Sequence, residues 1–307
     1  MGSLTRRWLD STRVRRAYSR LMKFLLSLPV IALSAIAPLK AADIPDELKT
    51  NGFAIGCQAW TFNKFSVLEA IDKTAEAGGK VIEFFPGQKL SQDEPEVKFG
   101  HDATPDAWAK VKARLKEKNV TPIAYGVVGL SKDEAQSRKV FTFAKEFGIR
   151  VINTESVDAI DTFEKLVKEF DIKVGFHDHP KRPNDPNYRL WDPNYILEIV
   201  KDRDPRIGAC ADTGHWVRSG LKPVDCLRIL KGRIVSSHLK DLHAPLPSGH
   251  DVPYGTGVSD VAGILDEYRA QGFEGPISVE YEYNWENNTT DARQCIEFVR
   301  NYKKASK

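Results

Sequence analysis

From residue 53 onward, two patterns of apolar and polar positions alternate along the chain, and each occurs eight times. Short apolar runs predict buried strands, and apolar residues that recur every three or four positions predict amphipathic helices. The predicted strands are 53–59, 80–85, 122–127, 151–154, 173–177, 207–211, 234–239 and 276–281. The predicted helices are 66–77, 105–118, 132–147, 162–170, 193–200, 223–230, 261–271 and 291–303.

Local signals at the helix ends support these boundaries. Thr104 and Asp192 each precede a proline and suit the N-cap position, and Ser131 with Glu134 forms a capping-box pattern. Glycines that suit helix C-termini follow three helices, at Gly78, Gly148 and Gly272. Eight strand–helix units without a break in composition predict the α/β class and a single (β/α)₈ TIM barrel. A doubly wound open sheet is the alternative, but residues 56–61, GCQAWT, lack its phosphate-binding glycine motif.

Ionisable residues gather where the later strands end. Asp212, His238 and Glu280 each close a strand that begins with small or apolar residues. Alternate residues of a strand share a face, so each of them continues an inward-facing row. Polar groups that converge on one rim of a barrel indicate an active site rather than a packed core. Carboxylates with an imidazole favour a hard or borderline divalent cation.

Three segments give a family resemblance: 212–215 (DTGH), 238–241 (HLKD) and the strand that ends at Glu280. Together they resemble the sugar isomerase/epimerase superfamily with the xylose-isomerase-like TIM barrel, which is related to AP endonuclease family 2. The resemblance covers roughly residues 53–304. It implies one divalent cation held by Glu155, Asp212, His238 and Glu280, with Glu155 and Glu280 also as the catalytic acid and base. Glu282 competes with Glu280 for the strand-8 position.

Other residues are expected around the substrate. The resemblance places His179, His215 and Lys240 in contact with it, and Asp241 is expected to pair with Lys240. Glu83, at the end of the second strand, is expected to contact either a metal ligand or the substrate. His177 is expected to have a structural role low in the barrel. Four tryptophans lie near the same rim, and Trp60 is the one assigned to sugar binding; the others are Trp191, Trp216 and Trp285.

The expected reaction is proton transfer at a carbon next to a carbonyl group, through a metal-stabilised enediolate. Mn²⁺ is the expected cofactor, with Mg²⁺, Co²⁺ and Zn²⁺ as alternatives. The substrate is expected to be a non-phosphorylated sugar or keto-sugar, because no phosphate cradle is evident. Elimination from the same intermediate would instead make the protein a 3-keto-glycoside lyase or a keto-sugar hydratase or dehydratase. An endonuclease IV-like phosphodiesterase and a non-catalytic carbohydrate-binding barrel are remote alternatives.

The first 41 residues differ in composition from the rest. Seven basic residues precede an apolar run at 24–38, and Leu39 and Ala41 suit a signal peptidase site. The run is shorter than the about 20 residues of a membrane span. We therefore expect a secretory signal peptide at 1–41, a barrel domain at 42–307 and a periplasmic or extracytoplasmic location, without stable membrane insertion after cleavage. Residues 1–21 could be an upstream extension before a start at Met22, and an uncleaved anchor is the alternative.

Removal of this leader changes the charge of the protein. Residues 1–41 hold eight Lys or Arg and one Asp, which gives them a net charge of +7. Because the whole chain has a net charge of +3, the remaining chain has a net charge of −4. A mildly acidic body argues against a nucleic-acid partner, because binding phosphates requires a basic surface.

The four cysteines form no C-x-x-C pair, and no disulfide is assigned. A homo-oligomer formed through the outer helices is one open option for assembly.

Overall fold

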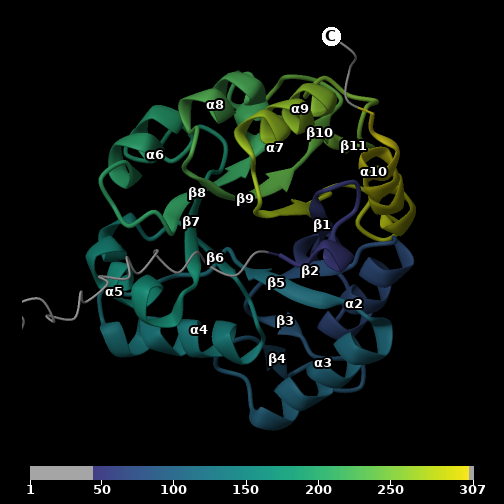
Figure 1. Cartoon of the computed structure of the whole chain (residues 1–307). Coiled ribbons are helices and arrows are strands. Elements are labelled where there is room, and N and C mark those ends of the chain that lie inside the picture. Colours follow the sequence, from purple (N-terminus) through teal and green to yellow (C-terminus); the bar gives the residue numbers. More distant parts are fainter. Residues whose placement is uncertain (1–43, 304–307) are drawn as a thin grey trace, which may run out of the picture. The chain divides into compact units, whose positions relative to one another are not determined.

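Eight parallel strands close into one barrel, as the alternating pattern predicts (Figure 1). The computed structural model describes residues 44–303, so the predicted signal peptide at 1–41 lies outside the described residues. Neighbouring strands follow the order β1-β2-β5-β6-β7-β8-β9-β12 and back to β1, which is the order of a (β/α)₈ barrel. The barrel strands are β1 (Ala54–Gln58), β2 (Val81–Phe84), β5 (Thr121–Tyr125), β6 (Val151–Thr154), β7 (Lys173–His177), β8 (Ile207–Asp212), β9 (Ile234–Leu239) and β12 (Pro276–Val279).

Helices surround the barrel as an outer layer (Figure 1). All eight predicted helices form, and α7, a short helix directly after β8, was not predicted. The helices are α2 (Val67–Glu76), α3 (Pro105–Lys118), α4 (Glu134–Glu146), α5 (Ile160–Phe170), α6 (Pro193–Val200), α7 (Thr213–Arg218), α8 (Pro223–Ile229), α9 (Val261–Gln271) and α10 (Thr289–Asn301). Short 3₁₀ segments lie at Asp46–Leu48, Ala59–Phe62 and Val157–Ala159. Within residues 44–303, no helix has the length and apolar character needed to cross a membrane.

Two small antiparallel sheets extend the loops at the carboxyl ends of the barrel strands. β3 (Gln88–Lys89) pairs with β4 (Lys98–Phe99) between β2 and α3. β10 (Asp241–Leu242) pairs with β11 (Asp251–Val252) between β9 and α9. Both sheets lie in strand-to-helix loops beside the barrel mouth, where binding and catalytic residues of such barrels gather.

Most of the predicted helix-end signals are confirmed, and one is wrong. Thr104 and Asp192 cap α3 and α6 as predicted, and Gly78, Gly148 and Gly272 adopt positive φ. The predicted capping box at Ser131 is wrong, because α4 starts two residues later and Asp133 caps it. The Ser131 hydroxyl instead accepts a hydrogen bond from the Asp133 amide. All four cysteines are buried free thiols.

Candidate metal and sugar site

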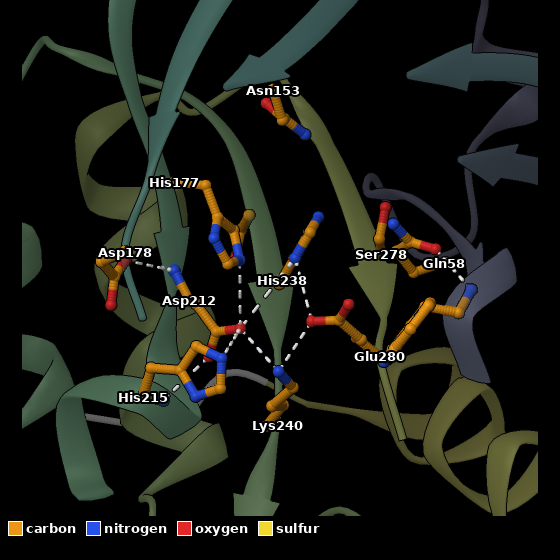
Figure 2. Close-up of polar contacts among 12 residues, drawn as sticks. Gln58, Asn153, His177, Asp178, Asp212, His215, His238, Lys240, Ser278 and Glu280 are labelled. Carbon is orange, nitrogen blue, oxygen red and sulfur yellow. Dashed lines mark hydrogen bonds and ion pairs between the residues drawn. The ribbon is translucent and has the colours of Figure 1, made fainter. Parts of the chain in front are cut away.

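Four side chains with metal-ligand chemistry meet at the carboxyl end of the barrel (Figure 2). His177 ends β7, Asp212 ends β8, His238 lies in β9, and Glu280 directly follows β12. One candidate ligand atom from each lies within 4.8 Å of the others. Asp212 pairs with His238 in the strand register, which places these two residues at one height. The predicted ligands Asp212, His238 and Glu280 are thus brought together, and His177 joins them.

Lys240 places its ammonium group between the two carboxylates of this cluster (Figure 2). Its Nζ lies 2.6 Å from Asp212 Oδ2, 2.7 Å from Glu280 Oε2 and 3.1 Å from Glu282 Oε2. Burial opposes the charged form, but Asp212 and Glu280 outweigh it and raise the pKa of Lys240 well above its ordinary value. Lys240 therefore supplies the positive charge that the carboxylates need in the buried site.

Gly214 makes room for the stem of Lys240. A Cβ atom added at Gly214 would lie 2.6 Å from Lys240 Cβ and 2.8 Å from its Cδ. These separations are too short for carbon atoms in contact. The glycine of the segment 212–215 is thus explained by a close approach between α7 and Lys240, the residue that follows β9.

Both ring nitrogens of His177 are buried without a hydrogen-bond partner. Nε2 lies 3.5 Å from Asp212 Oδ2 and Nδ1 lies 3.7 Å from Glu155 Oε1, beyond hydrogen-bonding distance. Burial opposes the imidazolium, but these two carboxylates raise the pKa of His177 to about 10. An unpartnered buried imidazole beside Asp212, His238 and Glu280 fits a divalent cation, since nitrogen and oxygen donors together suit Mn²⁺, Co²⁺ and Zn²⁺. The structural role expected for His177 is therefore corrected, because the structure groups this ring with the candidate metal ligands.

Glu155 belongs to a neighbouring group rather than to the main cluster. It forms with His177 and His179 a second set of candidate ligand atoms within 4.8 Å of one another. The Glu155 carboxylate contacts His179 Nδ1 and accepts a hydrogen bond of 3.3 Å from the Tyr188 hydroxyl. Burial acts to raise the pKa of Glu155, but the two histidines outweigh it and lower the pKa. His177 therefore links the predicted strand-4 ligand to the other three.

Glu83 supports the cluster from inside the barrel. Its Oε2 lies 3.0 Å from His238 Nε2 and accepts a hydrogen bond of 2.7 Å from the Ser278 hydroxyl. The amide of Asn153 donates to Oε1 at 2.8 Å. A carboxylate bonded to a candidate ligand histidine fixes the orientation of its ring. Of the two contacts expected for Glu83, the structure therefore forms the one to a candidate metal ligand.

A cavity of about 320 Å³ opens above the cluster. Among the predicted residues Glu280, His179, His215 and Trp60 line it, whereas Lys240 and Glu83 lie outside its lining. The remaining lining residues are Gln58, Phe85, Pro86, Gly126, Val127, His177 and Glu282. The cavity has the size of a small-molecule site, with titratable groups along its walls.

Arg218 joins the cavity to the β10–β11 sheet, and sequence reasoning missed it. Its Nη1 donates to His215 Nδ1 at 3.0 Å, and its Nη2 lies 2.7 Å from Asp251 Oδ2. Its Nε donates to the Gly249 carbonyl at 2.9 Å. Because Nδ1 of His215 accepts this bond, the neutral ring carries its proton on Nε2. Burial and nearby cations lower the pKa of His215 well below its ordinary value, although Asp212 opposes the shift.

Two sequence expectations near the site are corrected. The Asp241 carboxylate does not pair with Lys240, because it accepts hydrogen bonds from the backbone amides of Gly255, Gly257 and Ser259. It therefore anchors the loop after β11. Trp216 is fully buried, so it packs in the core rather than facing a ligand.

Trp60 lies in the cavity lining, with its backbone amide bonded to Gln58 and its indole packed against Phe85. The Gln58 side chain accepts a hydrogen bond of 2.6 Å from the Trp60 amide and donates one of 2.7 Å to the Gly126 carbonyl. The indole packs edge-on against Phe85, with ring centroids 5.0 Å apart, and 40% of Trp60 stays exposed. A partly exposed indole in a cavity lining suits contact with the C–H groups of a sugar.

The chain belongs to the xylose isomerase-like TIM barrel family, whose model matches residues 71–302. An uncharacterized protein from Parabacteroides distasonis is 31% identical, and the alignment covers 81% of this chain and 98% of that chain with a TM-score of 0.64. A D-tagatose 3-epimerase-like protein is 17% identical over 81% of this chain and 96% of its own, with a TM-score of 0.62. A protein from Bacillus anthracis named as the probable 3-DHS dehydratase AsbF is 17% identical over 80% of this chain and 98% of its own, with a TM-score of 0.58. No curated protein sequence matches the chain.

Proposed function

We propose that the protein is a divalent-metal-dependent isomerase or epimerase that acts on a non-phosphorylated sugar or keto-sugar. The observation that carries the proposal is the His177, Asp212, His238 and Glu280 cluster beneath a cavity lined with titratable groups. Membership of the xylose isomerase-like TIM barrel family supports it, as does similarity to an epimerase-like protein and to one named as a probable dehydratase. Because these two neighbours are only 17% identical to the chain, they support its fold but not a particular reaction. The choice of reaction therefore depends on the residues of the site.

The residues that would hold the cation are Asp212, His238 and Glu280, with His177 or Glu155 as a further donor. Mn²⁺ is the first candidate, followed by Mg²⁺, Co²⁺ and Zn²⁺. When bound, the cation polarises a carbonyl group of the substrate and thereby acidifies the neighbouring C–H bond. Glu83 supports the proposal because its carboxylate contacts His238 Nε2 and fixes the orientation of the imidazole ring.

The remaining groups would handle the proton. Burial acts to raise the pKa of Glu280, but Lys240 and His238 lower it well below its ordinary value, so this cavity-lining carboxylate is ionised and can accept a proton from carbon. Glu155 contacts His179, which also lines the cavity, and this pair would return a proton to the substrate. His215, neutral with its proton on Nε2, would donate a hydrogen bond to a substrate oxygen.

Elimination is the second candidate reaction, and Glu282 is the observation that favours it. This third carboxylate lines the cavity 3.1 Å from Lys240 and 3.2 Å from Arg218. The two cationic groups beside this carboxylate could stabilise negative charge on a departing oxygen, which would make the protein a 3-keto-glycoside lyase or a keto-sugar hydratase or dehydratase. Loss of the same C–H proton begins both reactions.

The test measures that shared step. Metal-loaded protein is incubated with a panel of keto-sugars and 3-keto-glycosides in D₂O, and deuterium at carbon is measured by NMR. Glu280→Gln and Glu155→Gln are each expected to lower the exchange rate by about 100-fold or more. Glu286→Gln, at an exposed position outside the cavity, is the matched control. Absence of exchange across the panel would refute enolisation, and unchanged exchange in both glutamine variants would refute the acid–base assignment.

We also propose that the protein acts outside the cytoplasm after removal of residues 1–41. The arginine-rich start, the apolar run and the Leu39 and Ala41 pair support this proposal. N-terminal sequencing of protein from the extracytoplasmic fraction should begin at Ala42. Recovery of the intact N-terminus from the soluble cytoplasm would contradict export.

A further inference from the structure

A second cavity adjoins the cavity above the metal cluster. Its volume is about 540 Å³, and Trp60 and Phe85 line both cavities. The second cavity continues over the β3–β4 sheet, and four more of its lining residues are Trp285, Lys64, Lys89 and Lys98. We call it the lysine–tryptophan cavity. A ligand in the first cavity could reach it across Trp60.

Positive charge is concentrated in this cavity. Within residues 44–303, none of Lys64, Lys89 and Lys98 forms an ion pair with a carboxylate, and Lys98 Nζ donates a hydrogen bond of 3.1 Å to the Pro95 carbonyl. The chain after residue 41 carries a net charge of −4, whereas this cavity is lined by three lysines and by no carboxylate.

Two of these lysines lie in an arrangement that is unfavourable for the stability of the β3–β4 sheet. Lys89 and Lys98 are direct partners in the antiparallel register of β3 and β4. Like charges that lie opposite each other destabilise a strand pair. An anion bound between them would remove the repulsion, which gives the pairing a physical reason.

The aromatic wall adds a second kind of recognition. Trp60 is anchored by Gln58 and packs against Phe85, and Trp285 lines the lysine–tryptophan cavity as a half-buried side chain. Indole faces bind the C–H faces of sugar rings, and ammonium groups bind carboxylates or sulfates. The two together fit a sugar ring that carries an anionic group.

We propose that the lysine–tryptophan cavity binds a second, anionic sugar unit, so that the substrate is an acidic glycoside whose reacting ring lies above the metal cluster. The anionic group is a carboxylate or a sulfate. The assignment of the reacting ring rests on the proposed function, whereas binding of the acidic unit rests on the lysine–tryptophan cavity.

The test compares equilibrium binding of three disaccharides by isothermal titration calorimetry. The probes are a glucose–glucuronate disaccharide, its sulfated counterpart and the neutral glucose disaccharide with the same linkage. The triple variant Lys64→Gln, Lys89→Gln and Lys98→Gln should weaken binding of an anionic probe by about 10-fold, from partly exposed charge pairs, and leave the neutral probe unchanged. The control triple variant at exposed positions on the outer layer is Lys116→Gln, Lys165→Gln and Lys231→Gln.

The outcomes separate this proposal from the proposed function. Loss of anion preference in the site variant but not in the control supports the subsite, and the stronger of the two anionic probes identifies carboxylate or sulfate. Equal affinity of the wild-type protein for neutral and anionic probes overturns it, and so does equal loss in both triple variants. Deuterium exchange is measured separately: anion preference without exchange would retain the subsite and refute the isomerase, and the reverse result would retain the isomerase alone.

Discussion

Lys240 gives the most direct test of how the buried site is held together. Its ammonium group contacts Asp212, Glu280 and Glu282, and the side chain is fully buried. Lys240→Met keeps an unbranched side chain of similar length and removes the charge. In the metal-free protein this leaves two buried carboxylates without their nearest cation.

The expected loss of stability is large. Removal of one partner from a buried ion pair costs about 3–5 kcal/mol, and about 2–4 °C of Tm corresponds to each kcal/mol in a protein of roughly this size. The metal-free variant should therefore melt about 6–20 °C below the wild-type protein. A divalent cation should restore more stability to the variant than to the wild-type protein, because it replaces the missing positive charge. At about 100 times its Kd, a cation adds about 2.7 kcal/mol.

Differential scanning calorimetry with EDTA, followed by titration with Mn²⁺, measures both effects. Lys231→Met, at an exposed position after α8, is the control and should change Tm little. A metal-free Lys240→Met protein that melts within about 2 °C of the wild type would show a loss of roughly 1 kcal/mol or less and would refute the reasoning. Equal stabilisation of both proteins by Mn²⁺ would show that the lysine and the cation do not share the carboxylates.

Three further predictions concern neighbouring residues. Gly214→Ala should displace the Lys240 stem and lower stability by about 1–3 kcal/mol in urea unfolding, and an unchanged midpoint would contradict the close approach. The pKa of His177 is raised to about 10 from 6.5, so its charged form stabilises the metal-free fold fully below pH 6.5, and that contribution disappears as pH rises through 10. Urea unfolding at several pH values should show this decline in the free energy of unfolding of the wild type and a flatter pH dependence in His177→Gln. The same pH dependence in both proteins would show that His177 is not charged in the metal-free fold. Trp60→Leu should weaken sugar binding about fivefold by calorimetry through loss of about 1 kcal/mol of stacking, and an unchanged Kd would remove Trp60 from the site.

The sequence by itself determined the barrel and three members of the candidate metal cluster. Eight alternations between the two apolar patterns specify eight strand–helix units, because each element must bury its own apolar face. The positions of Asp212, His238 and Glu280 followed from the same pattern. Residues at the carboxyl ends of parallel barrel strands share one rim whatever the details of packing.

Only the tertiary structure decided which groups share that rim at contact distance. The height of a residue depends on the stagger between neighbouring strands, and a register shift between Ala209 and Cys210 alters that stagger in β8. Sequence periodicity contains no information on this stagger, so it did not show that His177 lies between Glu155 and Asp212. It also did not show that Lys240 lies between the two carboxylates. That contact brings the Lys240 stem, directly after β9, close to Gly214 of α7, which is a property of the packed barrel.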